Sequence, residues 1–270
     1  MKTESIFYFF IKLSFILILF LSTIRCNQLP KEIPDYEVAA QWADMTLHIT
    51  KNTPANSPTF ASRCFGYMGL AQYEAIVHGT SDHKSLAGQL NQLESLPIPN
   101  SDDSYNWLMV LNRSQSELLK SLYLQTSDQN KLKIDSLENR IQKILEKNEN
   151  RKTTTKSIAY GTELAKALFD WSKTDGGHRG YLKNFDQDFN REPFPGSWKP
   201  PLFAQSFSHK PLHSFWGENR TFAPQNTSLE LPEYIEYDPV EGSEYYNQFL
   251  SVYQKKNNLT LEEKEAAIWW

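Results

Sequence analysis

Cysteine is scarce in this chain of 270 residues, which contains only Cys26 and Cys64. If Cys26 is modified, Cys64 has no partner and no structural disulfide can form, so the fold then depends on packing alone. Phe65 and Tyr67 lie close to Cys64 in the sequence. This apolar setting predicts a buried, inert thiol and not a catalytic nucleophile.

Motifs of the common enzyme classes are missing as well. There is no GxSxG nucleophile elbow, no P-loop, no GxGxxG fingerprint and no HExxH zinc motif. The net charge is -4 and no basic stripe with interleaved aromatics occurs, so nucleic acid is not an expected partner. What is present is ordinary for a globular protein, with 40% hydrophobic and 22% charged residues.

Residues 1–26 differ in composition from the rest of the chain. Lys2 and Lys12 precede or interrupt an apolar run from Ile6 to Ile24. The uninterrupted part, residues 13–24, is shorter than the roughly 20 residues that cross a bilayer. It suits the hydrophobic region of a secretory signal. We therefore predict a signal peptide over 1–26 and a body over 27–270.

The end of this segment resembles a bacterial lipoprotein signal, in which a cysteine becomes the acylated first residue. Cys26 is therefore the predicted lipidation site, and its lipid is the predicted contact with a membrane. Arg25 departs from the pattern, since a small residue normally precedes the cysteine. Plain secretion and an uncleaved anchor remain alternatives. All three place the body outside the cytoplasm, and the first predicts a periplasmic or outer-membrane-associated lipoprotein.

Apolar side chains repeat every three to four residues through most of the body, which is the pattern of core-facing helices. Ser57 and Pro58 are typical of an N-cap followed by proline at the first helical position. In the helix expected near the end of the chain, Tyr245, Phe249 and Val252 are predicted to point inward. The predicted helices cover residues 36–52, 57–79, 104–124, 128–148, 153–173, 241–256 and the stretch that follows Thr260.

Residues 174–240 lack this periodicity. Eight of the 14 prolines lie between Pro193 and Pro239, among many phenylalanines and tryptophans. Disordered linkers have few aromatics, so this composition predicts an ordered excursion packed by aromatic rings. No strand alternation occurs. The predicted fold class is therefore all-α, a helical bundle with a long Pro- and aromatic-rich loop excursion.

Two pairs of residues have a spacing that metal sites use. His209 and His213 are four residues apart, but Pro211 lies between them and prevents a helix. Glu74 and His78 have the same spacing on a predicted helix. Two ligands alone do not make a site, so an ordinary contact is the favoured interpretation and no metal site is predicted.

A glycine-rich segment runs from Asp175 to Gly180. Such turns can bind anions through backbone N–H groups, but this one follows a helix C-terminus, where the helix dipole repels anions. We interpret it as the punctuation of a loop. The sequence also holds Asn-x-Ser/Thr sequons, which matter only in a glycosylating host. They are at Asn112, Asn219, Asn226 and Asn258.

The body also carries a series of short segments in a characteristic order. They are Ser57-Pro58, Ser62-Arg63, Gln72-Tyr73-Glu74-Ala75, Lys84-Ser85-Leu86-Ala87-Gly88-Gln89-Leu90, Ala159-Tyr160-Gly161, Trp171-Ser172, Gly196-Ser197-Trp198-Lys199-Pro200-Pro201, Phe215-Trp216-Gly217, Arg220-Thr221-Phe222, and the region from Asn258 to Trp270. Their order and spacing over residues 35–270 resemble the N-terminal half of exported bacterial proteins of the vanadium-dependent haloperoxidase/PAP2 (phosphatidic acid phosphatase type 2) superfamily.

The resemblance implies a helical bundle that holds vanadate or phosphate. The family's anion pocket combines a Lys followed by Arg-Pro, a Pro-Ser-Gly-His segment, and a Ser-Arg segment ending in Gly-x-His. Several guanidinium forks suit a highly charged oxyanion, and histidines supply the nucleophile or apical ligand and the general acid/base. This chain contains no Arg-Pro and no Pro-Ser-Gly-His, and Ser62-Arg63 lacks the following histidine. No catalytic, cofactor-binding or metal-binding residue is therefore assigned, and vanadate or phosphate is expected only in the full-length family.

These absences lead to the expected function. Residues 27–270 are expected to be the scaffold half of an acid phosphatase- or haloperoxidase-like exported protein, lacking the C-terminal catalytic half and inactive alone. That half, or a second copy of the chain, is the expected partner. The alternative is a non-catalytic cell-surface lipoprotein that acts as a binding module. Trp198, Trp216 and Phe222 are expected to be packing anchors, with the wall of a substrate channel as the alternative role.

Overall fold

A computed structural model describes residues 32–192, 194–201 and 208–269 of the chain. The predicted signal peptide over 1–26 and its lipidation site Cys26 lie outside the described residues. The described part consists of helices and loops without a strand, which confirms the predicted all-α class. In that part, no helix combines the length and the apolar character that crossing a bilayer requires.

The observed helices follow the predicted ones closely. The largest shifts at a helix start are three residues, because the helices predicted from 104 and from 241 begin at Trp107 and Glu244. The α-helices are α2 (Asp35–Lys51), α3 (Pro58–Ile76), α4 (Trp107–Leu122), α5 (Asp128–Leu145), α6 (Arg151–Ser172), α7 (Glu244–Asn257) and α8 (Leu261–Trp269). Short 3-10 helices occur at η1 (Val77–Gly79), η2 (Glu146–Asn148), η3 (Gly180–Leu182), η5 (Trp216–Glu218) and η6 (Pro224–Thr227).

Polar side chains cap the starts of several of these helices and so fix where they begin. Ser57 accepts a hydrogen bond from the backbone N–H of Phe60 at 3.2 Å, which confirms the N-cap predicted for α3. Asn106 caps α4 by accepting from the N–H of Met109. At α8, Thr260 accepts from the N–H of Glu263, and the Glu263 carboxylate accepts from the N–H of Thr260. This reciprocal pair is a capping box, which confirms the predicted start of the last helix.

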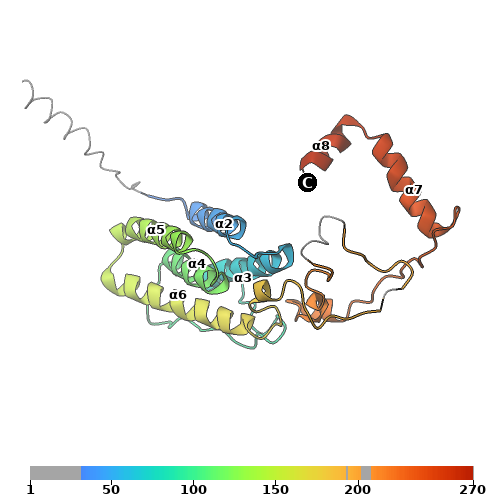
Figure 1. Cartoon of the computed structure of the whole chain (residues 1–270). Helices are drawn as coiled ribbons and strands as arrows, with labels where there is room; N and C mark the ends of the chain where they lie inside the picture. The colour runs from blue at the N-terminus through green and yellow to red at the C-terminus, as the bar shows by residue number, and fades with distance from the viewer. Residues whose placement is uncertain (1–31, 193, 202–207, 270) are drawn as a thin grey trace, which may run out of the picture. The chain divides into compact units, whose positions relative to one another are not determined.

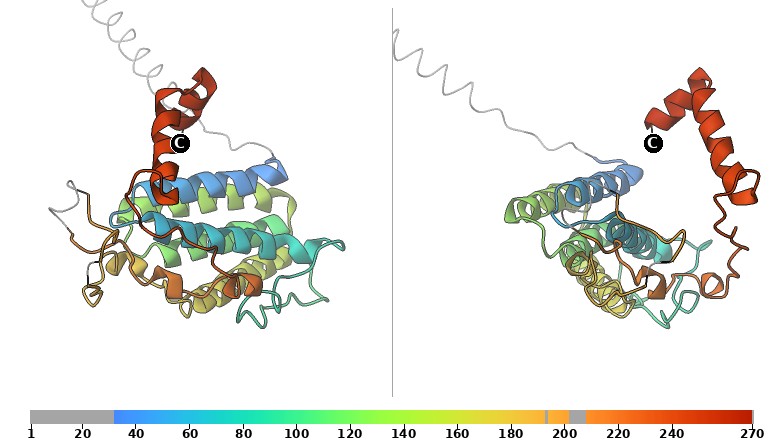
Figure 2. Two further views of the ribbon diagram at one scale, coloured as in Figure 1. Left: turned by 90° about the vertical axis from the view of Figure 1, so that its right-hand side faces the viewer. Right: turned by 45° about the vertical axis from the view of Figure 1, so that its right-hand side comes forward.

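The chain divides into two compact units. The described residues of the first are 32–54, 64–85 and 96–169, and those of the second are 55–63, 86–95, 170–192, 194–201 and 208–269. In the first unit, α2, α4, α5 and the unit's part of α6 lie side by side, as Figures 1 and 2 show. Their apolar faces form the core, with Trp42, Ile49, Leu118, Ile141 and Leu164 fully buried.

A polar seam runs through the core of this first unit. The indole of Trp42 donates to Asn112 at 3.0 Å, and the Asn112 amide donates to the backbone oxygen of Glu138 at 3.1 Å. The Glu138 carboxylate pairs with Arg113 at 2.8 Å. Buried polar groups are tolerated when each has a partner, and these contacts fix α2, α4 and α5 in one register.

A close approach between α4 and α6 depends on glycine. A Cβ atom on Gly161 would lie 2.7 Å from the backbone oxygen of Val110 and 3.0 Å from the Cβ of Arg113. Any side chain at this position would therefore push the two helices apart. The glycine of the Ala159-Tyr160-Gly161 segment accordingly has a packing role.

The second unit contains the long excursion, and aromatic rings pack it in part, as predicted. The ring of Phe222 meets that of Trp171 edge-on at 5.4 Å. The guanidinium of Arg220 lies 4.6 Å from the centre of the Trp171 ring. Other aromatics of the excursion stay open to solvent, including Phe194 and Trp198. The excursion is therefore ordered around a few anchors and is not buried throughout.

The predicted burial of the helix over 241–256 is wrong. α7 and α8 contain no buried residue. Phe249 is 63% exposed and Val252 is 70% exposed, while Tyr245 is half-buried against Tyr237 and Phe249. The apolar periodicity was sufficient to predict the helix, but apart from the contact of Tyr237 with Tyr245 the described residues leave its apolar face uncovered.

Candidate functional site

The glycine-rich segment after α6 is held by a buried ion pair. Arg63 Nε donates to Asp175 Oδ2 at 2.6 Å and Nη2 donates to Oδ1 at 3.2 Å, with the two side chains 6% and 5% exposed. Arg63 also donates to the backbone oxygen of Ser172. Asp175 Oδ1 accepts a further hydrogen bond from the N–H of Gly177 at 2.8 Å. This segment is therefore more than a loop boundary, because its first residue, Asp175, binds Arg63 in the N-terminal part of α3.

His213 is buried in the same unit, and hydrogen bonds at both ring nitrogens fix the orientation of its ring. Its Nε2 lies 3.1 Å from the backbone oxygen of Gly180 and 2.9 Å from Asn184 Oδ1, and both of these are acceptors. Nε2 therefore carries the proton, and Nδ1 accepts from the hydroxyl of Thr59. Burial lowers the pKa of His213, and the hydrogen bond to Gly180 only partly opposes this. Trp216 stacks on the ring at 4.5 Å.

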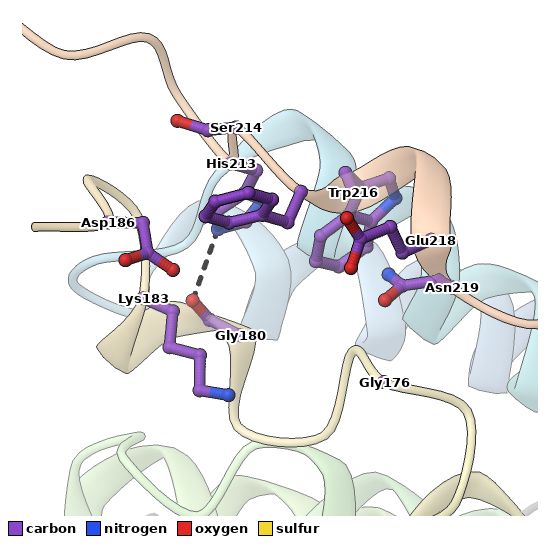
Figure 3. A pocket seen from close by; sticks show the side chains of 10 residues that line it. Gly176, Gly180, Lys183, Asp186, His213, Ser214, Trp216, Glu218 and Asn219 are labelled. Carbon is purple, nitrogen blue, oxygen red and sulfur yellow. Dashed lines mark hydrogen bonds between the residues drawn. The ribbon is translucent and has the colours of Figure 1, made fainter. Parts of the chain in front are cut away.

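A cavity of about 320 Å³ opens beside this histidine. Figure 3 shows Lys183 and Asp186 on one side of it and Glu218 and Asn219 on the other, with His213 at the back. The segment that follows η3 supplies Lys183 and Asp186, and the segment around η5 supplies the other groups. The cavity is the candidate site because charged and amide side chains converge in it beside the buried His213.

The charge of this cavity does not suit a tetrahedral oxyanion. Its wall carries one cation, Lys183, and two carboxylates, Asp186 and Glu218, a balance of 1 − 2 = −1. Vanadate and phosphate need several cationic donors that converge on their oxygens. The residues present therefore do not fit the anion that the family resemblance implies.

Two arginines of the unit that could hold such an anion are engaged by the chain itself. Arg63 is bound to Asp175, as described above. Arg220 Nη1 donates to Thr174 Oγ1 at 2.7 Å, and its Nη2 donates to the backbone oxygen of Trp171 at 2.8 Å. Both guanidinium groups thus join segments of the unit and do not face the cavity as free donors.

The residues with metal-like spacing do not form a metal site in the described part of the chain. His209 is exposed, whereas both ring nitrogens of His213 make hydrogen bonds. Glu74 is buried and accepts from Ser85 at 2.8 Å, while His78 meets the ring of Tyr160 edge-on. Among the described residues, no group of three or more His, Cys, Asp or Glu side chains is placed to hold a metal ion.

The remaining predicted residues have mixed outcomes. Cys64 is fully buried, as its neighbours indicated. Trp216 and Phe222 are packing anchors, whereas Trp198 is 55% exposed and anchors nothing comparable. Of the four sequons, Asn112 is fully buried, Asn219 is half-buried, and the other two, Asn226 and Asn258, are exposed.

Sequence reasoning missed the long-range pairs of this site. Arg63 and Asp175 are 112 residues apart, and Thr59 and His213 are 154 residues apart. One signal was available, because Arg63 lies on the same helix face as Phe60 and Tyr67. A charged residue on an apolar face of a helix indicates a buried partner.

Comparison with solved structures confirms the resemblance at the level of the fold. A structure described as the first bacterial vanadium-dependent iodoperoxidase matches 85% of this chain, with a TM-score of 0.61 and 23% sequence identity. The match covers 52% of the iodoperoxidase, so this chain spans about half the length of that protein. A search of family models and a search of curated proteins gave no match. At this level of identity the likeness establishes a shared fold.

Proposed function

We propose, from the fold shared with a vanadium-dependent iodoperoxidase, that this chain is the scaffold part of a haloperoxidase-like exported protein. The groups that bind the oxyanion would come from the remainder of the fold, either on a longer polypeptide or on a separate one. The observation that carries this proposal is the coverage, which is 85% of this chain but 52% of the iodoperoxidase. By itself the described chain would be inactive.

The charges of the described residues support this division of roles. The cavity beside His213 has an excess of negative charge, and Arg63 and Arg220 are bound within the unit. A vanadate-binding site that used those guanidinium groups would require their release, and the loss of Arg63 would leave the buried Asp175 carboxylate unpaired at a cost of several kcal/mol.

The apolar surface of α7 and α8 also supports the proposal. Phe249, Val252 and Ile268 are 63%, 70% and 85% exposed. Large contiguous apolar surfaces on soluble proteins usually mark an interface. We infer that the remainder of the fold packs on this surface, which the described residues leave uncovered.

Inactivity is tested with the full chain and inorganic orthovanadate. We expect no iodide oxidation above the vanadate-only rate when hydrogen peroxide is added, and no broadening of the free vanadate signal in ⁵¹V NMR. Turnover of iodide or bromide, or hydrolysis of a phosphate ester by the chain alone, would contradict the proposal.

The scaffold role is tested with a chimera. Residues 27–270 are joined to the part of the iodoperoxidase that this chain does not match, and the product is compared with the chain alone. We expect the chimera to bind orthovanadate and to expose less apolar surface. A chimera that folds but gains no vanadate binding would favour the alternative function, a non-catalytic lipoprotein that acts as a binding module.

Export and lipidation are a separate part of the proposal. The apolar run and Cys26 support a lipid-anchored protein outside the cytoplasm. In a bacterial host, radiolabelled palmitate should label the wild-type chain and not the Cys26→Ser variant, with Cys64→Ser as the matched control. Equal labelling of wild type and Cys26→Ser would leave plain secretion or an uncleaved anchor as the explanation.

A further inference from the structure

His213 and Ser214 also line a second cleft, with a volume of about 580 Å³. Its apolar walls include Phe194, Trp198 and Leu212, which are 55%, 55% and 41% exposed. The volume lies within the range of small-molecule sites, which are mostly apolar with a few polar groups. Two aromatic rings and a leucine facing such a cleft offer a surface for a flat apolar group.

A rigid turn positions the aromatic wall. The N–H of Ser197 donates to the backbone oxygen of Phe194 at 2.9 Å, which closes a turn around Pro195 and Gly196. Gly196 has a φ of +81°, as the third residue of a type II turn requires. Tyr237 packs directly on this glycine, where a Cβ would lie 2.5 Å from the ring. The wall is therefore set before any ligand arrives.

The charged groups of this cleft differ from those elsewhere in the unit. Arg191 and Lys199 line it, together with a single carboxylate, Glu192. Among the described residues, neither cationic side chain makes a hydrogen bond or ion pair, whereas the nearby Lys210 ammonium donates to the backbone oxygens of Gln187 and Phe189. With histidines neutral, the balance is 2 − 1 = +1. One positive charge of the cleft wall is thus not balanced by a carboxylate of the wall.

We propose that this cleft binds a small aromatic monocarboxylate. The ring would lie between Phe194, Trp198 and Leu212, and the carboxylate would pair with Arg191 or Lys199. A single negative charge matches the one excess cation of the wall, and the exposed aromatics supply the apolar contact. The inference rests on this loop alone and is independent of the proposed haloperoxidase-like function.

Binding is measured by calorimetry with the full chain, using 2-naphthoate and its neutral counterpart 2-naphthamide. We expect naphthoate to bind on the order of tenfold more tightly than naphthamide, because a hydrogen bond to a charged group strengthens binding by about that factor. The double variant Arg191→Gln/Lys199→Gln should lose this preference and bind both compounds alike. Lys143→Gln, at an exposed lysine of α5, is the matched control and should keep the preference.

The location is tested by NMR with ¹⁵N-labelled tryptophan. Naphthoate should shift the indole signal of Trp198, assigned by its loss in Trp198→Phe, and leave that of the exposed Trp269 in place. Trp198→Ala should weaken the binding of both compounds. The proposal is wrong if the two compounds bind equally, if neither binds, if the double variant keeps the preference, or if the shifts fall only on other tryptophans.

Discussion

The guanidinium of Arg63 donates to Asp175 and to the backbone of Ser172 in a setting that is almost closed to solvent. The Arg63→Met variant keeps much of the side-chain volume but leaves a buried carboxylate without its counter-charge. We expect it to lower the free energy of unfolding by about 3–5 kcal/mol, measured by urea titration. The double variant Arg63→Met/Asp175→Asn should recover part of that loss.

An ion pair on the surface provides the control for the Arg63→Met variant. Lys131 lies 3.1 Å from Asp128, whose side chain is 95% exposed. Lys131→Ala should therefore change stability by less than about 1 kcal/mol. If Arg63→Met costs no more than Lys131→Ala, the buried pair does not hold the second unit together.

His213 gives the second unit a pH dependence whose sign follows from its pKa. Burial lowers this pKa below the ordinary value, so between the two values the unfolded chain binds more protons than the folded one. The contribution of His213 to the free energy of unfolding is therefore fully present above about pH 6.5. It is lost as the pH drops through the folded pKa.

The His213→Gln variant checks this expectation. It should show a smaller decrease in melting temperature between neutral and mildly acidic pH than the wild type does. His178, whose pKa is also lowered by burial and by Arg63, leaves a residual dependence. His209→Gln, at an exposed histidine, is the control and should show the same decrease as the wild type. If its decrease is as small as that of His213→Gln, the pH dependence does not come from His213.

At the scale of elements, two helical glycines should respond to alanine in opposite directions. Gly161 of α6 faces the backbone of α4, where a Cβ would lie 2.7 Å from Val110 O. Gly69 of α3 has open space around the same position. Gly161→Ala should lower the free energy of unfolding by about 1–3 kcal/mol through overpacking. Gly69→Ala should raise it by up to about 1 kcal/mol through helix propensity.

Among the helices, the sequence could predict the features that depend on nearby residues and could not predict those that depend on distant ones. Helix positions and the caps at Ser57 and Thr260 depend on neighbours within four residues, and these predictions were confirmed. Burial depends on what packs against a helix, and the inward placement of Phe249 and Val252 failed for that reason. The ion pair of Arg63 and the anchoring of His213 join residues more than a hundred positions apart, which local patterns do not encode.

For the whole molecule, the uncovered face of α7 and α8 predicts self-association of the isolated chain. Replacing Phe249, Val252 and Ile268 with serine should shift the chain toward monomer in analytical ultracentrifugation. Because these side chains are exposed, thermal stability should stay nearly unchanged. Association that is the same in wild type and triple variant would place the contact on another surface.

Asn112 has a consequence for the choice of expression host. Its amide is locked between the Trp42 indole and the Glu138 backbone in the polar seam, yet it belongs to an Asn-x-Ser sequon. In the secretory pathway of yeast or animal cells, an oligosaccharide is transferred to such a site while the chain is still being threaded into the lumen. A sugar tree at Asn112 has no room once α2 and α5 close around it. We therefore expect the protein made in yeast or animal secretory cells to misfold and to be retained. A host without the oligosaccharide transferase avoids modification of Asn112.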